Sequence, residues 1–264
     1  MSASRLPPTV AILGTGWLGL PLLTDLAGDH AIRGSCRSPS GAEAIRAAGG
    51  QPYDIDLPAA AGELPAFLDG ADTLVITLPP GGRTHGERTT EYYLSALAPL
   101  APFLRNGLHV LYTSSTGVYG NAVTGTVTET TPVAPDTASS RATVAAERWL
   151  REHAPSLAIL RLGGLFGPGR DPIDFFRRRE AIPEADAPVN LIGQQRAVAA
   201  LRFVITRRVT GIFNLCAADH PSKREFYGDR YRAAGRPPKP FLPGGGAGKR
   251  IDSTKFRLLG GPEL

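Results

Sequence analysis

The chain has 264 residues, of which 42% are hydrophobic and 20% are charged, and its mean hydropathy is −0.08. This balance is typical of a folded globular protein and excludes a disordered chain, and no apolar run reaches the roughly 18 residues that a membrane helix needs. The net charge of +5 comes mostly from arginines scattered along the chain, whereas a nucleic-acid-binding protein usually has a clustered basic face. We therefore expect a small-molecule substrate as the partner, and neither nucleic acid nor a membrane.

The cysteine content and the first residues of the chain indicate a reducing compartment. Cys36 and Cys216 are too few for a disulfide framework, and two thiols cannot hold a metal ion alone. Only Arg5 precedes the first apolar stretch at Val10, and glycines interrupt that stretch, so we expect no secretory signal. The expectation is a cytoplasmic protein without a metal site.

Short apolar runs alternate with helical segments up to residue 162, and one further apolar run follows at 212–216. Strands are predicted at 9–13, 31–35, 73–78, 109–113, 158–162 and 212–216, and helices at 17–27, 43–48, 92–104 and 138–153. This alternation predicts an α/β fold, a doubly wound parallel Rossmann sheet with helices on both faces. Proline and glycine become frequent after residue 163. We therefore predict a Rossmann domain at 1–163 and a small C-terminal substrate-binding lobe at 164–264, from which strand 212–216 returns to the main sheet.

A glycine-rich turn directly follows the first predicted strand and precedes the first predicted helix. It reads Gly14-Thr15-Gly16-Trp17-Leu18-Gly19, the G-x-G-x-x-G pattern of dinucleotide-binding folds. In this pattern the first glycine permits a tight turn, the second lets the backbone approach a pyrophosphate, and the third allows close packing. The helix N-terminus adds amide donors and a favourable dipole. These six residues are the predicted pyrophosphate site.

The end of the second predicted strand distinguishes between the two nicotinamide cofactors. NAD-specific sites place a carboxylate there, about 20 residues after the glycine turn, whereas this chain reads Ser35-Cys36-Arg37-Ser38. Arg37 is suited to pair with a 2′-phosphate, with Ser35 and Ser38 as additional donors. NADP is therefore the predicted cofactor and NAD the less favoured one. The alternative is that Arg37 is an ordinary solvated arginine.

Three later segments carry a family resemblance. Residues 114–120 read Ser-Ser-Thr-Gly-Val-Tyr-Gly, residues 161–169 read Arg-Leu-Gly-Gly-Leu-Phe-Gly-Pro-Gly, and residues 213–215 read Phe-Asn-Leu. Together with the glycine turn they resemble the extended short-chain dehydrogenase/reductases, the epimerase/dehydratase group. Segments 16–22, 74–79 and 216–221 are similar to its atypical YeeZ-like subgroup, whose members are described mostly as NAD(P)-dependent epimerases or dehydratases.

The resemblance implies roles for several residues. The chain departs from the family at the tyrosine and lysine that transfer a proton. Ser115 matches the hydroxyl that hydrogen-bonds the substrate oxygen whose charge changes, and Leu78 and Pro79 join the cofactor-binding set. The family's Tyr-x-x-x-Lys is replaced by Thr137 and Arg141. A threonine hydroxyl cannot relay a proton near neutral pH. Arg141 keeps its charge, so it is suited to bond the ribose or a phosphate but not to relay a proton.

The missing tyrosine leaves the acid or base of a reaction unassigned, and three residues are candidates for it. His85 follows the predicted strand 73–78 and His220 follows strand 212–216, at the carboxyl edge where ligands bind in doubly wound folds. Tyr119 in the segment 114–120 is the third. Each has a structural alternative, which is an exposed loop histidine or a packed tyrosine.

Two functions from different classes stay open. One is an NADP-dependent oxidoreductase or epimerase acting on a small polar substrate, such as an imine, which is electrophilic once protonated. The other is a catalytically silent NADP-binding sensor or partner-binding protein, which the missing tyrosine and lysine favour. A nucleotide-sugar enzyme fits less well because the second lobe is small. The sequence leaves a homodimer open.

Overall fold

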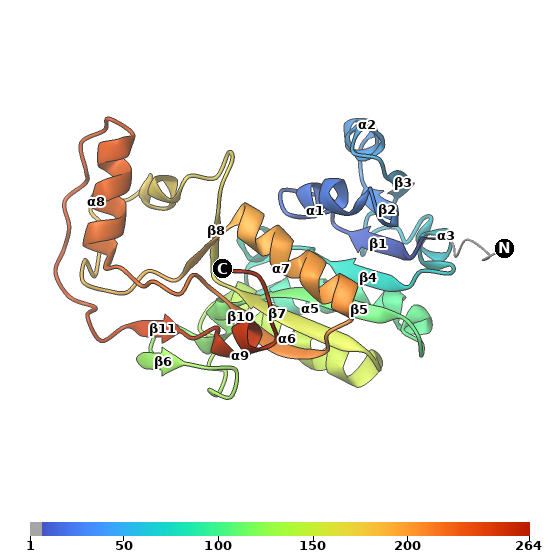
Figure 1. The fold of residues 1–264 in the computed structure, drawn as a ribbon. Helices are drawn as coiled ribbons and strands as arrows, with labels where there is room; N and C mark the ends of the chain where they lie inside the picture. The colour runs from blue at the N-terminus through green and yellow to red at the C-terminus, as the bar shows by residue number, and fades with distance from the viewer. Residues whose placement is uncertain (1–6) are drawn as a thin grey trace. The chain divides into compact units, whose positions relative to one another are not determined.

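A computed structural model describes residues 7–264, and residues 1–6, Arg5 among them, lie outside the described residues. Figure 1 follows the chain from its blue N-terminal part to its red C-terminal part. The strands of the main sheet are β1 (Thr9–Leu13), β2 (Ala31–Cys36), β3 (Gln51–Asp54), β4 (Thr73–Ile76), β5 (His109–Ser115), β7 (Leu157–Leu162) and β10 (Gly211–Leu215). Two short pairs are separate from it: β6 (Gly125–Val127) with β11 (Lys249–Ile251), and β8 (Gly164–Phe166) with β9 (Leu191–Gly193).

The helices alternate with these strands along the first half of the chain. The α-helices are α1 (Gly19–Leu26), α2 (Pro39–Ala47), α3 (Leu64–Leu68), α4 (Gly82–His85), α5 (Thr89–Leu97), α6 (Ala138–His153), α7 (Gln194–Arg207), α8 (Lys223–Ala233) and α9 (Thr254–Leu258). The 3-10 helices are η1 (Gly86–Arg88), η2 (Ala98–Phe103), η3 (Thr116–Tyr119) and η4 (Pro172–Phe176).

The main sheet has the order β10-β7-β5-β4-β1-β2-β3. Strand β1 is parallel to both β2 and β4, and the pairs β2–β3 and β4–β5 are parallel as well. The order reverses at β1, because the chain moves outward to β3 on one side and returns to β4 on the other. The predicted doubly wound α/β fold is confirmed, and the glycine turn follows β1 at this switch point, where such folds bind ligands.

Both faces of the sheet are buried, as expected when helices cover each face of a parallel sheet. Successive side chains of a strand point to opposite faces. Ala11 of β1 packs in a core cluster with Leu97 of α5 and Leu150 of α6. Val10 and Ile12 point to the other face and are equally inaccessible to solvent, and α1 packs against β1 and β2.

The chain divides into two compact units. The first comprises the residues up to 114, with 137–160 and 201–212, and the second comprises 115–136, 161–200 and 213–264. The second unit has its own apolar cluster, in which Tyr227 and Tyr231 of α8 pack with Ile173 and Ile182. Strand β10 lies at the edge of the main sheet, next to β7. The predicted domains at 1–163 and 164–264 stay a prediction.

Helices α3, α4, α7, α8 and α9 are absent from the sequence prediction, and two predicted helices have other bounds for a clear physical reason. The segment 92–104 is not one helix, because α5 ends at Leu97 and a 3-10 helix continues to Phe103; prolines in this stretch lack the amide hydrogen that an α-helix uses. Helix α2 begins at Pro39 because Ser38 accepts a hydrogen bond from Gly41 N and caps it. Helix α7 is absent from the prediction, although its sequence contains neither proline nor glycine.

Cys36 is partly exposed and Cys216 is buried, and both are free thiols. In the part of the chain that the structure describes, no helix is long and apolar enough to cross a membrane.

Candidate functional site

The glycine turn between β1 and α1 has a conformation that requires two of its glycines. Gly14 has a φ of +106°, and a Cβ there would lie 2.8 Å from Thr77 Oγ1. The Thr77 hydroxyl, which follows β4, donates to Gly14 O at 2.5 Å. A Cβ on Gly19 would overlap the same carbonyl oxygen. The packing of the turn itself therefore explains Gly14 and Gly19.

Ser35 and Thr15 connect this turn to β2. Gly14 N donates to Ser35 Oγ at 2.8 Å, and the Thr15 hydroxyl donates to Ser35 O. Because Ser35 is buried, its side chain holds the turn in place. Its expected role as a donor to a cofactor phosphate stays a prediction.

Gly16 differs from the other two glycines of the turn. It is exposed, its backbone needs no positive φ, and a Cβ there would meet no atom within 4 Å. The fold therefore gives no reason for a glycine at this position, whereas the close approach of a dinucleotide pyrophosphate does. No side-chain hydrogen bond caps the N-terminus of α1, and this end of the helix favours an anion. The turn fits a dinucleotide, and within it Trp17 is half-buried and Leu18 is buried.

Arg37 directly follows β2, and its guanidinium forms an ion pair with the carboxylate of Asp56, which the sequence pattern did not predict. Arg37 Nη1 lies 3.4 Å from Asp56 Oδ1, and the two side chains are 73% and 49% exposed. Asp56 is fixed by two backbone hydrogen bonds with Ala60, of 3.1 and 2.7 Å. An exposed pair of this kind stabilises by only about 0–1 kcal/mol, so a phosphate can replace Asp56 at low cost. Ser38 is exposed next to Arg37 and caps α2.

Leu78 and Pro79 follow β4 next to the glycine turn. Thr77 N donates to Leu13 O at 3.0 Å and continues the ladder between β4 and β1. Leu78 O accepts from the Tyr93 hydroxyl at 2.7 Å. Burial raises the pKa of Tyr93, so this phenol stays protonated and acts as a structural donor. The backbone of Leu78 is therefore fixed at the carboxyl edge of the sheet.

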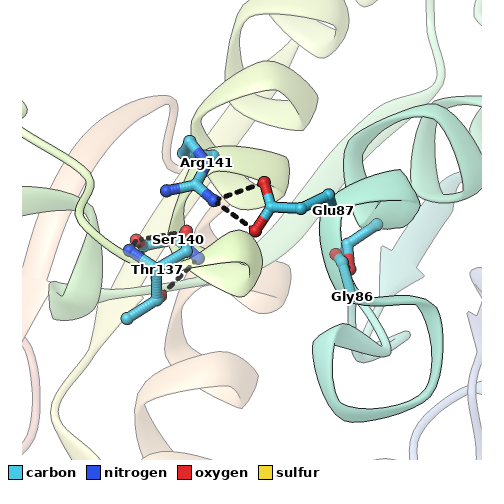
Figure 2. Close-up of polar contacts among 6 residues, drawn as sticks. Gly86, Glu87, Thr137, Ser140 and Arg141 are labelled. Carbon is cyan, nitrogen blue, oxygen red and sulfur yellow. Dashed lines mark hydrogen bonds and ion pairs between the residues drawn. The ribbon is translucent and has the colours of Figure 1, made fainter.

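The start of α6 carries the two residues that replace the family's tyrosine and lysine. Thr137 is the N-cap, since its Oγ1 accepts from Ser140 N at 3.1 Å while Ser140 Oγ accepts from Thr137 N at 3.0 Å. Figure 2 shows this capping box together with Arg141, whose Nη2 lies 3.1 and 3.3 Å from the two carboxylate oxygens of Glu87 in η1. Thr137 thus begins the helix, and Arg141 already has an anionic partner within the first unit.

His85 is the last residue of α4 and stacks on Tyr92 of α5. The two ring centroids are 3.6 Å apart and the rings are inclined by 18°. Gly82, at the other end of α4, lies so close to Ser139 of α6 that a Cβ would overlap the serine hydroxyl. His85 is therefore held on a short helix that packs against α6, and its role in proton transfer stays a prediction.

Helix α6 also carries a buried carboxylate that sequence reasoning missed. Glu147 is 4% exposed and accepts a hydrogen bond from Ser114 Oγ at 2.5 Å. Ser114 lies on β5, one residue before Ser115, so this bond fixes the end of β5 to the helix. An acidic residue among the alanines of the apolar face of α6 was the signal for such a buried contact.

Ser115 and Tyr119 belong to the second unit and differ in exposure. Ser115 is exposed and accepts from Gly117 N at 3.0 Å. Tyr119 is fully buried, and its hydroxyl donates to Asn214 Oδ1 at 2.7 Å and accepts from Arg161 Nη1 at 2.9 Å. Burial raises the pKa of Tyr119. These contacts favour a structural role for Tyr119, whereas Ser115 presents its hydroxyl to solvent.

His220, also in the second unit, follows β10. Its Nδ1 lies 3.1 Å from Val189 O. Because a carbonyl oxygen only accepts, Nδ1 carries the proton of this bond and Nε2 is the nitrogen left for a ligand. Its role as a catalytic residue stays a prediction.

Two carboxylates that face predicted cofactor arginines were not anticipated. Asp56 lies 19 residues from Arg37, and Glu87 lies 54 residues from Arg141. Spacing rules for ion pairs apply to neighbours on one helix, and neither pair is of that kind. Only the pairing of β2 with β3 and the packing of η1 against α6 bring them together.

No family model matches this chain. It is 38% identical over 267 residues to Protein YeeZ of Escherichia coli K12, covering 97% of this chain and 92% of that protein. Among solved structures it is similar to the UDP-glucose 4-epimerase of Thermus thermophilus in complex with NAD, with a TM-score of 0.76, 17% identity and coverage of 96% and 93%. It is also similar to a short-chain dehydrogenase/reductase superfamily protein of Agrobacterium tumefaciens with bound NAD, with a TM-score of 0.77, 16% identity and coverage of 97% and 92%.

Proposed function

Because this chain belongs to the YeeZ family, we propose that it is an NADP-dependent oxidoreductase or epimerase of the short-chain dehydrogenase/reductase type, acting on a small polar substrate. The similar solved structures contain NAD, and one is an epimerase named for UDP-glucose. This likeness supports a nicotinamide nucleotide as cofactor and a small molecule as substrate. The choice of NADP over NAD rests on Arg37 alone.

The observation that carries the proposal is the unexplained glycine at position 16. Gly14 and Gly19 are required by the turn, but Gly16 has open space over it and an ordinary backbone conformation. Gly28 is as open as Gly16, but Gly16 lies in the turn between β1 and α1, where the backbone of doubly wound folds approaches a dinucleotide. The adjacent N-terminus of α1 favours a negatively charged ligand there.

A bound nicotinamide nucleotide supplies hydride transfer, and the residues of the chain bind and orient it. The turn 14–19 binds the pyrophosphate, and Arg37 exchanges Asp56 for the 2′-phosphate. When the nucleotide binds, Arg141 releases Glu87 and donates to the ribose or a phosphate. The guanidinium keeps its charge and its hydrogen-bond donors with either partner. Ser115, with its exposed hydroxyl, donates to the substrate oxygen on which charge develops.

Proton transfer in this chain needs a different group from the family's tyrosine. The hydroxyl of Thr137 caps α6, and Tyr119 is buried with a raised pKa. The remaining candidates are His85 and His220, or a substrate such as an imine that is already protonated. The same contacts favour the second candidate function, a catalytically silent NADP-binding protein. Turnover of NADPH with any carbonyl or imine substrate separates the two.

The test of nucleotide binding uses Gly16→Val and a matched control. NADPH and NADH are titrated by fluorescence against the parent protein, Gly16→Val and Gly28→Val. Gly28 is also exposed, and a Cβ there also meets no atom within 4 Å, so both variants are expected to fold. The expected result is that Gly16→Val loses both dinucleotides while Gly28→Val binds like the parent. Parental affinity in Gly16→Val would show that the nucleotide site lies elsewhere.

A further inference from the structure

A cavity of about 740 Å³ lies within the second unit. It is bounded by the β6–β11 pair, the segment after β10, the first turn of α7, helix α9 and residues 263–264. Its volume is in the range of small-molecule sites, about 300–1,000 Å³. Of the residues that the proposed function uses, only His220 lines it.

Hydrogen bonds fix the walls of this cavity. Cys216 N donates to Ser253 Oγ at 3.0 Å, and the Ser253 hydroxyl donates to Cys216 O at 3.2 Å. Thr254 N donates to Asp252 Oδ1 at 2.7 Å. His220 is held through Nδ1 by Val189 O at 3.1 Å. A cavity with walls held in this way is largely formed before a ligand arrives, which lowers the entropic cost of binding.

Three arginines line the cavity, and one of them already holds a carboxylate. Arg196 Nη2 lies 3.2 Å from Glu263 Oε1, and its Nη1 bonds Leu264 O. Arg257 donates to Thr254 Oγ1 at 2.7 Å through one nitrogen. Within residues 7–264 the guanidinium of Arg250 makes no hydrogen bond and no ion pair. The lining of the cavity therefore includes one arginine without a partner among the described residues and another that already binds a carboxylate.

We propose that this cavity is a binding site for a small aliphatic monocarboxylate, whose carboxylate is held by Arg250 and Arg257. The apolar part of the ligand would contact Ala218, Ile251 and Leu264, which also line the cavity.

The charge balance of the cavity favours a monoanion over a polyanion. Three carboxylates, those of Asp219, Asp252 and Glu263, line it together with the three arginines. The formal charges of these six side chains cancel, so a ligand with one negative charge gains from Arg250 and meets less repulsion from the carboxylates than a phosphate dianion would.

The cavity is suited to binding rather than to covalent chemistry. Its one thiol, Cys216, has its pKa raised to about 12 by burial and by the nearby Asp219 carboxylate, so it stays protonated near neutral pH and is a poor nucleophile. The proposal does not depend on nucleotide binding, because every residue that it uses belongs to the second unit.

The test is calorimetric titration of the full chain with three probes: 4-methylpentanoate, its neutral amide and inorganic phosphate. We expect the carboxylate to bind and the amide and phosphate to bind at least about tenfold more weakly. Arg250→Ala should weaken carboxylate binding about tenfold or more, the scale of a charge-assisted hydrogen bond. Glu263→Gln, which removes one negative charge from the lining of the cavity, should tighten it about threefold.

The matched control is Arg178→Ala, which removes an exposed arginine of the same unit that does not line the cavity. It should bind the carboxylate like the parent. Circular dichroism melting of each variant separates loss of binding from loss of fold. Equal binding of carboxylate and amide, or parental affinity in a folded Arg250→Ala, would overturn the proposal. Stronger binding of phosphate would overturn the choice of a monoanion.

Discussion

The protein should lose stability in mild acid because one histidine is buried, and burial disfavours its protonated, charged form. His109 begins β5 and is fully buried. Its Nδ1 lies 3.1 Å from Ser156 Oγ, while its Nε2 has no hydrogen-bond partner in the described structure. Burial, and secondarily the charge of Arg208, lower the pKa of His109 from 6.5 to about 4.

The sign and size of the effect follow from this shift. Above about pH 6.5 the imidazole is neutral in both states, so it contributes nothing to the pH dependence. Below pH 6.5 the unfolded chain binds a proton that the folded protein binds only near pH 4, so the free energy of unfolding falls as the pH falls. A shift of this size corresponds to about 3 kcal/mol lost between pH 6.5 and 4.

The assay is urea unfolding between pH 7 and pH 4.5, followed by circular dichroism, on the parent and on His109→Gln. Glutamine is neutral at every pH, so the variant should be less stable at pH 7 but lose about 2–3 kcal/mol less on acidification. The control His153→Gln removes an exposed histidine at the end of α6 and should follow the parent curve. Parallel curves for the parent and His109→Gln would refute the assignment of the acid sensitivity to His109.

Two further predictions concern the cofactor and the reaction. Arg37→Ala should weaken NADPH binding by about 0.5–3 kcal/mol, the gain from the 2′-phosphate less the cost of displacing Asp56, with little effect on NADH. Asp56→Asn should tighten NADPH binding by up to about 1 kcal/mol because it frees Arg37. Fluorescence titration measures both, and equal NADPH affinity in parent and Arg37→Ala would contradict the site. If the protein is an enzyme, Ser115→Ala should slow single-turnover hydride transfer on the order of a hundredfold. Thr137→Ala should leave that rate nearly unchanged and lower the free energy of unfolding by about 1 kcal/mol through the lost cap. A slow Thr137→Ala together with a normal Ser115→Ala would contradict the proposed position of the active site.

The parts of the fold that could be predicted are those in which local pattern and tertiary environment agree. Strand β1 and helix α6 have the predicted bounds, because β1 is a short apolar run before a glycine turn and α6 has a threonine cap and a clear apolar face. Helix α5 ends early because prolines follow it. The short strands β8 and β9 pair over three residues each, and no pattern of that length separates a strand from a loop.

In the candidate site, the residues that could be predicted are those at which the backbone conformation or a close backbone contact permits only glycine. Gly14 is required by its positive φ, and Gly19 by a carbonyl oxygen that leaves no room for a Cβ. The role of Ser35 as a donor to the cofactor stays a prediction, and its observed contact, in which its hydroxyl accepts from Gly14 N, needs β1 and β2 side by side. The partners of Tyr119 lie 42 and 95 residues away along the chain. Such contacts depend on tertiary packing and leave no local signal.

Under the proposed function, the exposed pair Arg37–Asp56 determines how strongly this site discriminates between cofactors, and the exposed pair Arg141–Glu87 does not contribute to the discrimination. The 2′-phosphate gains about 1.5–3 kcal/mol from Arg37 but must first displace Asp56, which costs about 0–1 kcal/mol at such exposure. The proposed site therefore predicts a net preference for NADPH of about 0.5–3 kcal/mol. NADH leaves the pair intact and meets neither the gain nor the cost. Arg141 and Glu87 act alike for both dinucleotides, because ribose and pyrophosphate are common to them. The selectivity that we propose for this chain thus depends on one arginine and on the carboxylate that follows β3.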